Sequence, residues 1–319
     1  MTSLDREPIA VSVIVPVYDT RAYLSRCLDS VLNQTLQEIE VIVVDDASTD
    51  DSGTILRRYA GEDRRLRVVQ HERNQGLHLA RISGVVASSG QYIGYVDSDD
   101  HVARDMFECM YRHAVNRQAD VVRTGAWLRR EGDAQARQKN GSAATLSFSA
   151  CTYSAGIDYL DSDFYPSMCL HLHRRRLWDL ALPHFPRTRL IGEDNLTSFV
   201  LAFFAGRVVS LPNLGYFYVE RDASLTGDQS FASIARHIED RGTIVRLLKD
   251  FVDARGGRAT RCWSLLRANN RALLFSYIDS LRSRAERMAA RALFEAAWAE
   301  QVPSERTAVW ARSDLTISR

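Results

Sequence analysis

The first third of the chain alternates between short apolar runs and longer segments with helical periodicity. The first run, VSVIVPVYD, begins at Val11, and we expect Pro16 to end it. The segment TRAYLSRCLDSVLNQT follows, with apolar residues three and four positions apart, which predicts a helix with one buried face. A second run spans Ile39 to Val44 and precedes another predicted helix, DASTDDSGTILRRYA. Strands that are apolar on both faces are typical of a parallel sheet covered by helices on each side.

The same alternation continues through the next thirty residues. Leu66 to Gln70 predicts a third strand, NQGLHLARISGVVASSG a loop and a helix, and QYIGYV a fourth strand. Strands and helices that alternate in this way predict an α/β fold: an open, doubly wound, mostly parallel sheet with helices on both faces. In such sheets ligands bind at the carboxyl ends of the strands, where the strand order reverses.

The later elements are less regular. Further strands are expected at Asp120–Ala126, Ser167–Arg174 and Val208–Tyr218, the last two closing over the site, and a loop or hairpin at Arg129–Ser149. From Ser230 onward the pattern is helical, and Gly256 and Gly257 separate two helical stretches. We therefore predict a nucleotide-binding and catalytic domain at residues 1–229. A helical region at 230–319 would serve acceptor docking or self-association, for example as a homodimer.

The fourth predicted strand runs directly into Asp97, Ser98, Asp99 and Asp100. Carboxylates this close raise one another's pKa unless a cation lies among them, which favours a divalent metal site. If the backbone stays extended, Asp97 and Asp99 point to one side and Ser98 to the other. Oxygen ligands suit Mg²⁺ or Mn²⁺, and Mg²⁺ usually keeps phosphate oxygens in its shell, so the expected ligand is a diphosphate. The alternative is a polar turn that caps the following helix.

Composition narrows the class of protein. The 319 residues are 45% hydrophobic and 25% charged with a net charge of +1, which gives no bulk attraction to nucleic acid. The five cysteines form no CxxC pair, so we expect neither a zinc site nor a disulfide framework, and a reducing cytoplasm fits. No signal segment and no apolar run of about 20 residues is seen, so we expect no transmembrane segment. A cytoplasmic protein is expected, either free in solution or peripheral at the membrane.

Six segments in a familiar order carry a resemblance to a known family. They read VSVIVPVYD, EVIVVDDASTDDS, NQGLHLAR, YIGYVDSDD, IGEDNLTSF and YFYVERDASLT. Together, from Val11 to Thr226, they resemble the nucleotide-sugar-dependent glycosyltransferases of family two, which have the GT-A fold. The resemblance implies inverting transfer of a sugar from a nucleotide-diphosphate sugar, with a UDP-sugar favoured, and a divalent metal cofactor. The acceptor hydroxyl stays open: a soluble natural product, a peptide or saccharide, or a lipid-linked glycan.

The resemblance also implies roles for residues at the strand ends. Pro16 and Tyr18 belong to the loop that wraps the nucleotide base, and Asp46 accepts a hydrogen bond from that base. The alternative for Asp46 is the cap of the second helix. Asp97 would contact the ribose or the metal, and Asp99 would be the metal ligand proper.

Three further residues are placed with the nucleotide. Ser98 lies between the two aspartates. Arg81 would lie near the base or the diphosphate, with an exposed helix arginine as the alternative. Arg221 lies in a late loop that closes on the diphosphate, where Ser224 and Thr226 supply nearby hydroxyls.

Glu193 and Asp194 occupy the acidic pair of the family, in which the aspartate is the general base. An acceptor hydroxyl is a poor nucleophile, so a carboxylate within hydrogen-bond reach must take its proton. The alternative is a helix first turn in which acids are favoured by the macrodipole. His171 and His173 stand where a lysine and an aromatic residue are common in the family. We expect core histidines there, and the difference leaves the acceptor open.

Other classes of protein fit less well. A phosphatase with a nucleophilic aspartate would need a downstream motif with a lysine, and this sequence has none. A nicotinamide enzyme would need GxGxxG after the first strand, which is also missing. A nucleotidyltransferase on a similar sheet would need a glycine-rich phosphate loop with a lysine after the first strand. A catalytically inactive sugar-nucleotide-binding protein or scaffold remains the alternative from a different class.

Overall fold

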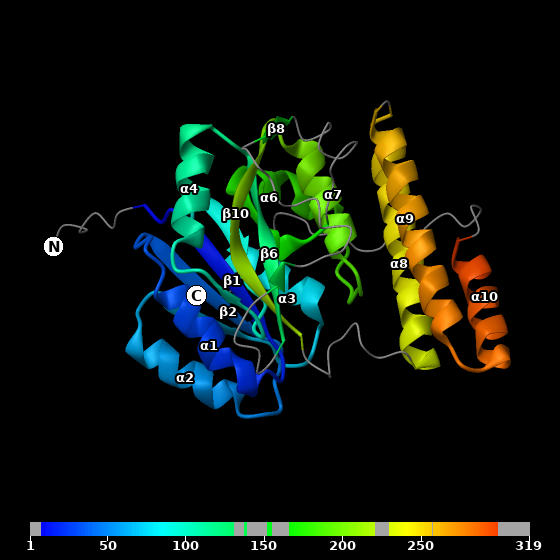
Figure 1. Cartoon of the computed structure of the whole chain (residues 1–319), viewed down its shortest axis with the longest axis horizontal. Helices are drawn as coiled ribbons and strands as arrows, with labels where there is room; N and C mark the ends of the chain where they lie inside the picture. Colours follow the sequence, from blue (N-terminus) through cyan, green and yellow to red (C-terminus); the bar gives the residue numbers. More distant parts are fainter. Residues whose placement is uncertain are drawn as a thin grey trace.

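A computed structural model describes residues 8–130, 137–138, 152–154, 166–220, 230–256 and 258–298. It contains one ten-stranded sheet flanked by helices, with three further helices alongside (Figure 1). The strand order is β3-β2-β1-β4-β9-β6-β10-β5, with two short strands at the margins. The expected α/β fold is therefore confirmed.

The first half of the sheet is parallel, as the apolar runs predicted. Its strands are β1 (Val11–Val17), β2 (Ile39–Asp45), β3 (Leu66–Gln70) and β4 (Tyr92–Tyr95). Every residue of β1 and β2 is buried, because these central strands are covered on both faces. The expectation that Pro16 ends the first strand is wrong. Pro16 lies inside β1 and pairs with Val44 of β2. The fixed φ of proline is compatible with extended backbone, and the residue lacks only its own N–H donor.

Helices connect these strands on both faces of the sheet. They are α1 (Arg21–Leu32), α2 (Ser52–Glu62), α3 (Leu77–Ala87) and α4 (Met106–Asn116). Figure 1 shows α1 and α2 side by side. Right-handed crossovers place α1 and α2 on one face and α3 on the other, because the chain reverses its direction across the sheet between β3 and β4. The strand order therefore reverses at β1 and β4, which is where a ligand site is expected.

The second half of the sheet is mixed rather than parallel. β9 (His171–Arg174) lies antiparallel between β4 and β6 (Val121–Arg130), and β10 (Val208–Glu220) runs parallel to β6. Three short strands complete the sheet: β5 (His101–Val102), β7 (Arg137–Gln138) and β8 (Thr152–Ser154). The 3₁₀ turns η2 (Met168–Leu170) and η3 (Leu182–His184) and the helices α6 (Arg175–Ala181) and α7 (Asp194–Phe204) lie between β9 and β10 or next to β9. The strand predicted from Ser167 begins only at His171, because a 3₁₀ turn precedes it. Most of the loop or hairpin predicted at Arg129–Ser149 lies outside the described residues.

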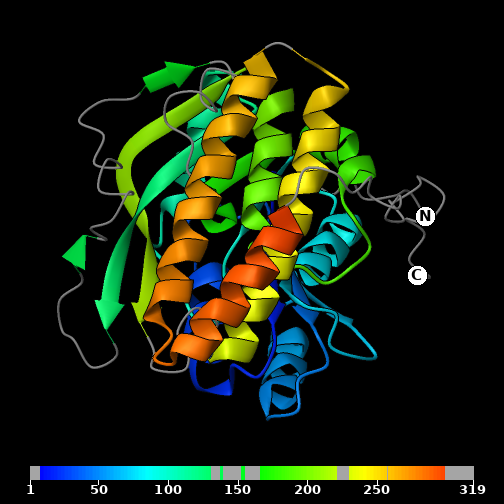
Figure 2. The same cartoon turned by 90° about the vertical axis from the view of Figure 1, so that its right-hand side faces the viewer.

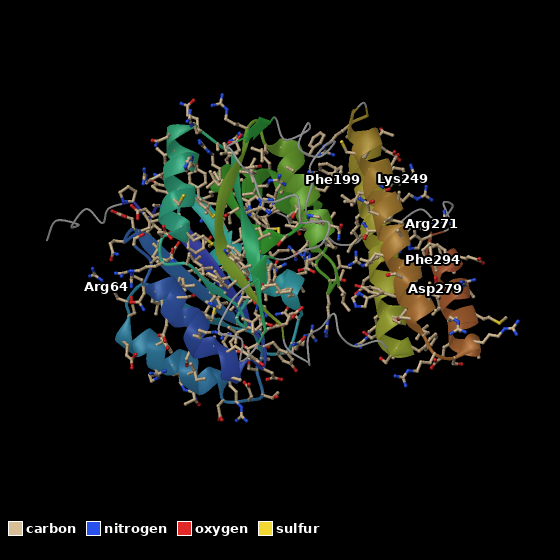
Figure 3. The ribbon with its side chains drawn as sticks, in the orientation of Figure 1. Arg64, Phe199, Lys249, Arg271, Asp279 and Phe294 are labelled. Carbon is tan, nitrogen blue, oxygen red and sulfur yellow. The ribbon has the colours of Figure 1, made fainter. Side chains whose placement is uncertain are left out.

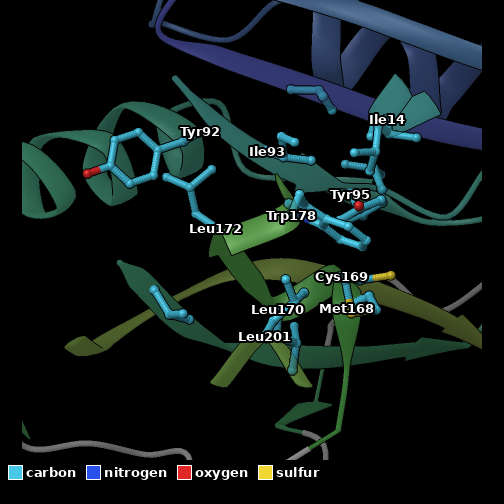
Figure 4. Packing of buried hydrophobic residues seen from close by; sticks show 14 of the residues in the cluster. Ile14, Tyr92, Ile93, Tyr95, Met168, Cys169, Leu170, Leu172, Trp178 and Leu201 are labelled. Carbon is cyan, nitrogen blue, oxygen red and sulfur yellow. The ribbon is translucent and has the colours of Figure 1, made fainter. Parts of the chain in front are cut away.

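The main core lies between the sheet and the helices that cover it, from α1 to α7. Figure 4 shows Tyr95 and Trp178 close together, with Met168 and Cys169 near them. Trp178 is 1% exposed, and its ring contacts Tyr95 at 6.1 Å between centroids. Because η2 packs directly against β4 in this core, the side chains that follow β4 are held close to those of η2.

Three helices form a layer beside α7: α8 (Phe231–Asp253), α9 (Arg258–Ser280) and α10 (Arg284–Trp298). Figure 2 shows them side by side. The break predicted at Gly256 is confirmed. A second break after Ser280 was not expected, and it occurs where Ser283 accepts a hydrogen bond from the backbone N–H of Glu286.

The helical layer contributes to two apolar clusters. Ile244 and Leu248 of α8 join the main core, and Phe251 packs edge-on against Phe199 of α7, which Figure 3 labels. A second cluster joins the three helices to one another through Ile234, Ile238, Leu274, Ile278, Leu281, Ala290 and Phe294. The division at residues 229 and 230 stays a prediction. Among the described residues no helix is long and apolar enough to cross a membrane.

Candidate active site

Arg81 is the centre of the candidate site. It lies on α3 and is 4% exposed. Its Nη2 donates to Asp97 Oδ1 at 3.0 Å, and its Nη1 donates to Glu193 Oε1 at 2.8 Å and also to Asp194 Oδ1. The alternative of an exposed helix arginine is wrong. One guanidinium therefore joins the aspartate that follows β4 to the acidic pair that begins α7.

The charges around Arg81 keep it ionised. Burial lowers the pKa of Arg81, but the carboxylates of Asp194, Asp97 and Glu193 outweigh burial and hold the pKa well above its ordinary value. A planar guanidinium has five N–H donors in a fixed fork, which suits binding to several carboxylates at once. Within the described residues the Nε of Arg81 has no hydrogen-bond partner. Arg81 is thus a permanent cation in a site rich in acids.

The segment after β4 forms a turn. The strand ends at Tyr95, and the N–H of Asp100 donates to the carbonyl of Asp97 at 2.9 Å. The expectation that Asp97 and Asp99 share one side of an extended strand is therefore wrong, because the chain turns as soon as it leaves the sheet. The Asp97 carboxylate is held on its other side by Cys169, whose Sγ donates to Oδ2 at 3.0 Å.

Asp100 anchors this turn to β10. Its Oδ2 accepts from the Tyr216 hydroxyl at 2.7 Å, and its Oδ1 accepts from the N–H of Val219 at 2.8 Å. The same hydroxyl accepts from the N–H of Asp97 at 3.1 Å. Burial raises the pKa of Asp100, and the negative charges of Asp97 and Asp99 raise it further. The three carboxylates therefore lie close enough to repel one another.

The alternative of a helix-capping turn is also wrong. The next helix, α4, begins only at Met106, and its N-cap residue is Asp105. Ser98 is 5% exposed and accepts a hydrogen bond from the Thr20 hydroxyl at 3.0 Å. The Ser98 side chain thus ties the turn to the start of α1, beside the loop that follows β1.

The donor set of the turn suits a hard divalent ion. The Asp97 side chain is 26% exposed and Asp99 is half-buried, so both can reach a ligand. Among the described residues no group of three or more histidine, cysteine, aspartate or glutamate side chains is arranged to hold a metal. Two carboxylates are enough for Mg²⁺ or Mn²⁺ when phosphate oxygens complete the shell. A cation there would also relieve the repulsion felt by Asp100.

The loops after β1 and β2 are joined beside this turn. Asp19, with φ 51°, accepts from the N–H of Thr49 at 2.7 Å. Tyr18 is 46% exposed, whereas Pro16 is buried in β1. An exposed aromatic ring on a fixed loop can stack on a base. The roles of Pro16 and Tyr18 in base binding stay predictions.

The Asp46 carboxylate is buried, and both of its oxygens accept hydrogen bonds from protein groups. It is 3% exposed, and it accepts from His71 Nδ1 at 2.6 Å and from the N–H groups of Gln75 and Gly76 at 2.8 and 2.7 Å. Burial raises the pKa of Asp46, but these hydrogen bonds outweigh burial and leave it below 3.8. The helix-cap alternative is wrong, because the N-cap of α2 is Asp51. Asp46 fixes the start of α3, and contact with the base stays a prediction.

Glu193 and Asp194 differ in exposure. The Asp194 side chain is 29% exposed and that of Glu193 only 5%. Burial and the charge of Asp194 raise the pKa of Glu193 to about 8, and burial raises the pKa of Asp194 above 3.8 against the charge of Arg81. A raised pKa suits a group that must accept a proton near neutral pH. Of the two acids, Asp194 is the one that is partly exposed to solvent.

The two histidines of the divergent segment are core residues, as expected. His171 and His173 are 3% and 2% exposed, and their rings stack at 5.5 Å. Burial lowers both pKa values, that of His171 to about 4, so both rings stay neutral. Arg221 lies outside the described residues, as do Ser224 and Thr226.

The family model described as Glycosyl transferase family 2 matches residues 12–184. The chain belongs to glycosyl transferase family 2. The family expected from the six segments is thus confirmed. Relatives agree: over 219 residues the chain is 35% identical to the uncharacterized glycosyltransferase EpsJ of Bacillus subtilis, covering 68% of this chain and 62% of EpsJ. The chain therefore spans less than two thirds of the length of that relative.

Solved structures share the fold. The structure of S. aureus TarS 1-349 in complex with UDP has a TM-score of 0.64 at 21% identity, covering 91% of this chain and 89% of that chain. The mannosyltransferase PcManGT from Pyrobaculum calidifontis, in complex with GDP-Man and Mn²⁺, has a TM-score of 0.54 at 18% identity, covering 91% and 86%. At such identities the likeness shows the GT-A-like fold alone.

Sequence reasoning missed several residues of the site. Cys169 was considered only for zinc and disulfides, and no pattern marks a thiol that binds Asp97. Tyr216 lies in the YFYVE segment, so its position could have suggested a contact with the site. Asp240 and Arg241 of α8 lie against the segment before Asp194, and no sequence pattern announces that contact.

Proposed function

We propose that this protein is an inverting glycosyltransferase that moves a sugar from a nucleotide-diphosphate sugar to an acceptor hydroxyl, with a UDP-sugar favoured. The observation that carries the proposal is the junction at Arg81. That guanidinium joins Asp97, at the carboxyl end of β4, to Asp194, the first residue of α7. Both carboxylates lie near the point where the strand order reverses, which supports a donor site beside a proton acceptor. The UDP bound to TarS, which shares the fold, supports a uridine nucleotide.

Metal dependence is part of the proposal. Asp97 and Asp99 would hold a divalent ion, Mg²⁺ or Mn²⁺, which suits their carboxylate oxygens. When bound, such an ion neutralises charge on the departing diphosphate. The mannosyltransferase PcManGT, which shares the fold, was solved with Mn²⁺. In this chain Arg81 adds a fixed positive charge on the same side as Asp97.

Asp194 would take the acceptor proton. Its exposure and its raised pKa suit a general base, whereas Glu193 is enclosed and contacts Arg81. Attack by the activated hydroxyl on the face opposite the leaving nucleotide inverts the anomeric configuration. The acceptor is left as a hydroxyl of a natural product, a saccharide or a lipid-linked glycan. Arg221 would close on the diphosphate, and a cytoplasmic or membrane-peripheral site of action is proposed with it.

A panel of UDP-, GDP- and dTDP-sugars with Mn²⁺ tests the proposal. A donor at about 100 times its Kd adds about 2.7 kcal/mol to the free energy of unfolding, so the right nucleotide raises the melting temperature. Release of nucleotide diphosphate from that donor, and inverted configuration in the product, would follow. Stabilisation by a donor without any release, with water or added glycans as acceptor, would favour the inactive sugar-nucleotide-binding protein.

A further inference from the structure

The segment that leads into Asp194 lies between two helices that are far apart in the sequence. On one side α3 contacts it: His78 Nε2 lies 3.2 Å from the carbonyl of Pro186, and Arg81 binds Glu193 and Asp194. On the other side α8 contacts it, because Asp240 Oδ2 accepts from the N–H of Ile191 at 2.9 Å. The family segment IGED is thus held by α8 of the helical layer as well as by α3.

Gly192 lies directly against that layer. Its φ is +81°, a conformation that glycine adopts without steric cost. A Cβ at this position would lie 2.9 Å from Cζ of Arg241, nearer than side chains approach. The left-handed turn immediately before the acidic pair is therefore packed directly against the Arg241 guanidinium.

Arg241 is itself fixed in place. It is 8% exposed, and its Nη1 donates to Asn270 Oδ1 of α9 at 2.5 Å. Asn270 in turn donates to the carbonyl of Leu266 at 2.9 Å, and its Nδ2 lies 3.5 Å from Asn195 Oδ1. Two helices of the layer therefore contact residues on both sides of the acidic pair.

The Arg241 guanidinium is a buried cation. Within the described part of the chain Arg241 forms no ion pair, and its Nε has no hydrogen-bond partner. Burial lowers the pKa of Arg241, and the charges of Tyr277, Glu193 and Asp194 oppose that shift. A buried cation without an ion pair is costly unless nearby carboxylates compensate it. Arg241 thus complements the acidic pair from α8, whereas Arg81 binds it from α3.

We propose that Arg241 and Asp240 are positioning residues, which fix the Gly192 turn and thereby the direction of the Asp194 carboxylate. This inference rests on the proposed role of Asp194 as general base. It gives the helical layer a part in the reaction itself, beyond the acceptor docking or self-association expected for that region. Misplacement of a catalytic group by about 1 Å from a distant change can cost about 10²-fold in rate, so contacts of this kind matter.

Arg241→Met is the first test, because methionine keeps much of the apolar stem and removes the guanidinium. We expect kcat to fall by about 10- to 100-fold. The rate is measured as nucleotide diphosphate release from the panel donor with the largest thermal shift. The donor Kd should change less than about twofold, since the described hydrogen bond of Arg241 goes to Asn270 of α9 rather than to Arg81, Asp97 or Asp46. Arg246→Met is the matched control, because Arg246 lies five residues further along α8 and donates to the carbonyl of Ala297 instead.

Asp240 supplies a second variant that does not depend on the fold tolerating Arg241→Met. Asp240→Ala removes the acceptor of the Ile191 N–H, whereas Asp240→Asn retains an oxygen that can accept it. We expect reduced kcat and faster hydrogen exchange at the Ile191 amide in Asp240→Ala, and recovery of both in Asp240→Asn. Unchanged exchange and unchanged kcat in Asp240→Ala would overturn the inference.

A double-mutant cycle separates positioning from any independent role. If Arg241 acts through Asp194, then Arg241→Met should cost nothing further in the Asp194→Asn background. Multiplying losses would overturn the inference while leaving Asp194 as the base. A full rate in Asp194→Asn would instead overturn the proposed role of Asp194 as the base, and this inference with it. A fall in kcat for Asp194→Asn, but not for Arg241→Met, would overturn the inference alone.

Discussion

Asp97 and Asp194 bind the same guanidinium, that of Arg81, although one follows β4 and the other begins α7. The two carboxylates would otherwise repel each other in a largely enclosed site, because the charge of Asp97 raises the pKa of Asp194. The Arg81 cation offsets that repulsion and holds both carboxylates in place. The donor half and the acceptor half of the proposed reaction are therefore joined through one side chain.

Removing Arg81 should destabilise the protein more than removing an arginine of the surface. In Arg81→Met the carboxylates of Asp97, Glu193 and Asp194 lose their shared cation, and breaking a buried ion pair typically costs about 3–5 kcal/mol. Urea unfolding measures the loss. Arg57→Met is the control: Arg57 is exposed on α2 and should change the free energy of unfolding by less than about 0.5 kcal/mol. Equal effects in the two variants would contradict the central role of Arg81.

Asp99→Ala should abolish the part of donor stabilisation that depends on metal. Wild-type protein with UDP should melt at a higher temperature with Mn²⁺ than with EDTA, since two carboxylates and the diphosphate complete the shell of the ion. In Asp99→Ala the two melting temperatures should coincide. Asp105→Ala, at the exposed N-cap of α4, should behave as wild type. Undiminished UDP stabilisation and turnover in EDTA would exclude the metal assignment.

The fold could be predicted from the sequence because it rests on local patterns. The apolar runs at β1, β2 and β4 and the helical spacing between them follow directly from burial on one face or on two. The turn at Asp97 was misjudged because alternation holds only while the strand continues, and this strand ends at Tyr95. The second half of the sheet is mixed because β9 inserts antiparallel beside β4, a pairing that no local pattern encodes.

The candidate site was predicted in pieces but not as a whole. Asp97 and Asp194 were both identified, each within its own segment, but an arginine on an amphipathic helix gives no sign of whether it is buried. Only the packing of α3 against the loop before α7 decides that Arg81 faces inward. The contact between Arg241 and Gly192 depends likewise on how a later helix docks.

The raised pKa of Glu193 should make stability depend on pH. Its carboxyl has a folded pKa of about 8 against an ordinary 4.5, so the folded protein binds the proton more tightly than the unfolded chain does. The stabilisation is fully present below 4.5 and is lost as pH rises towards 8. Wild-type protein should therefore lose unfolding free energy over this range. Glu193→Gln cannot ionise and should lose less, as urea unfolding at several pH values would show. Parallel curves for the two proteins would contradict the raised pKa.

Asp194→Asn tests the base directly. Asparagine keeps the shape and the hydrogen-bonding capacity of the residue but cannot take a proton, so kcat should fall by about 10²- to 10⁴-fold while donor Kd stays unchanged. Glu193→Gln removes the neighbouring ionisable group and should cost less, because Glu193 is 5% exposed and contacts Arg81 rather than solvent. A role confined to the first turn of α7 predicts another pattern: stability would fall by no more than about 1 kcal/mol and turnover would survive. Donor Kd, melting temperature and kcat for both variants separate these outcomes. If Asp194→Asn keeps more than about a tenth of the wild-type kcat, the loss is too small for a missing base, and Glu193 becomes the next candidate.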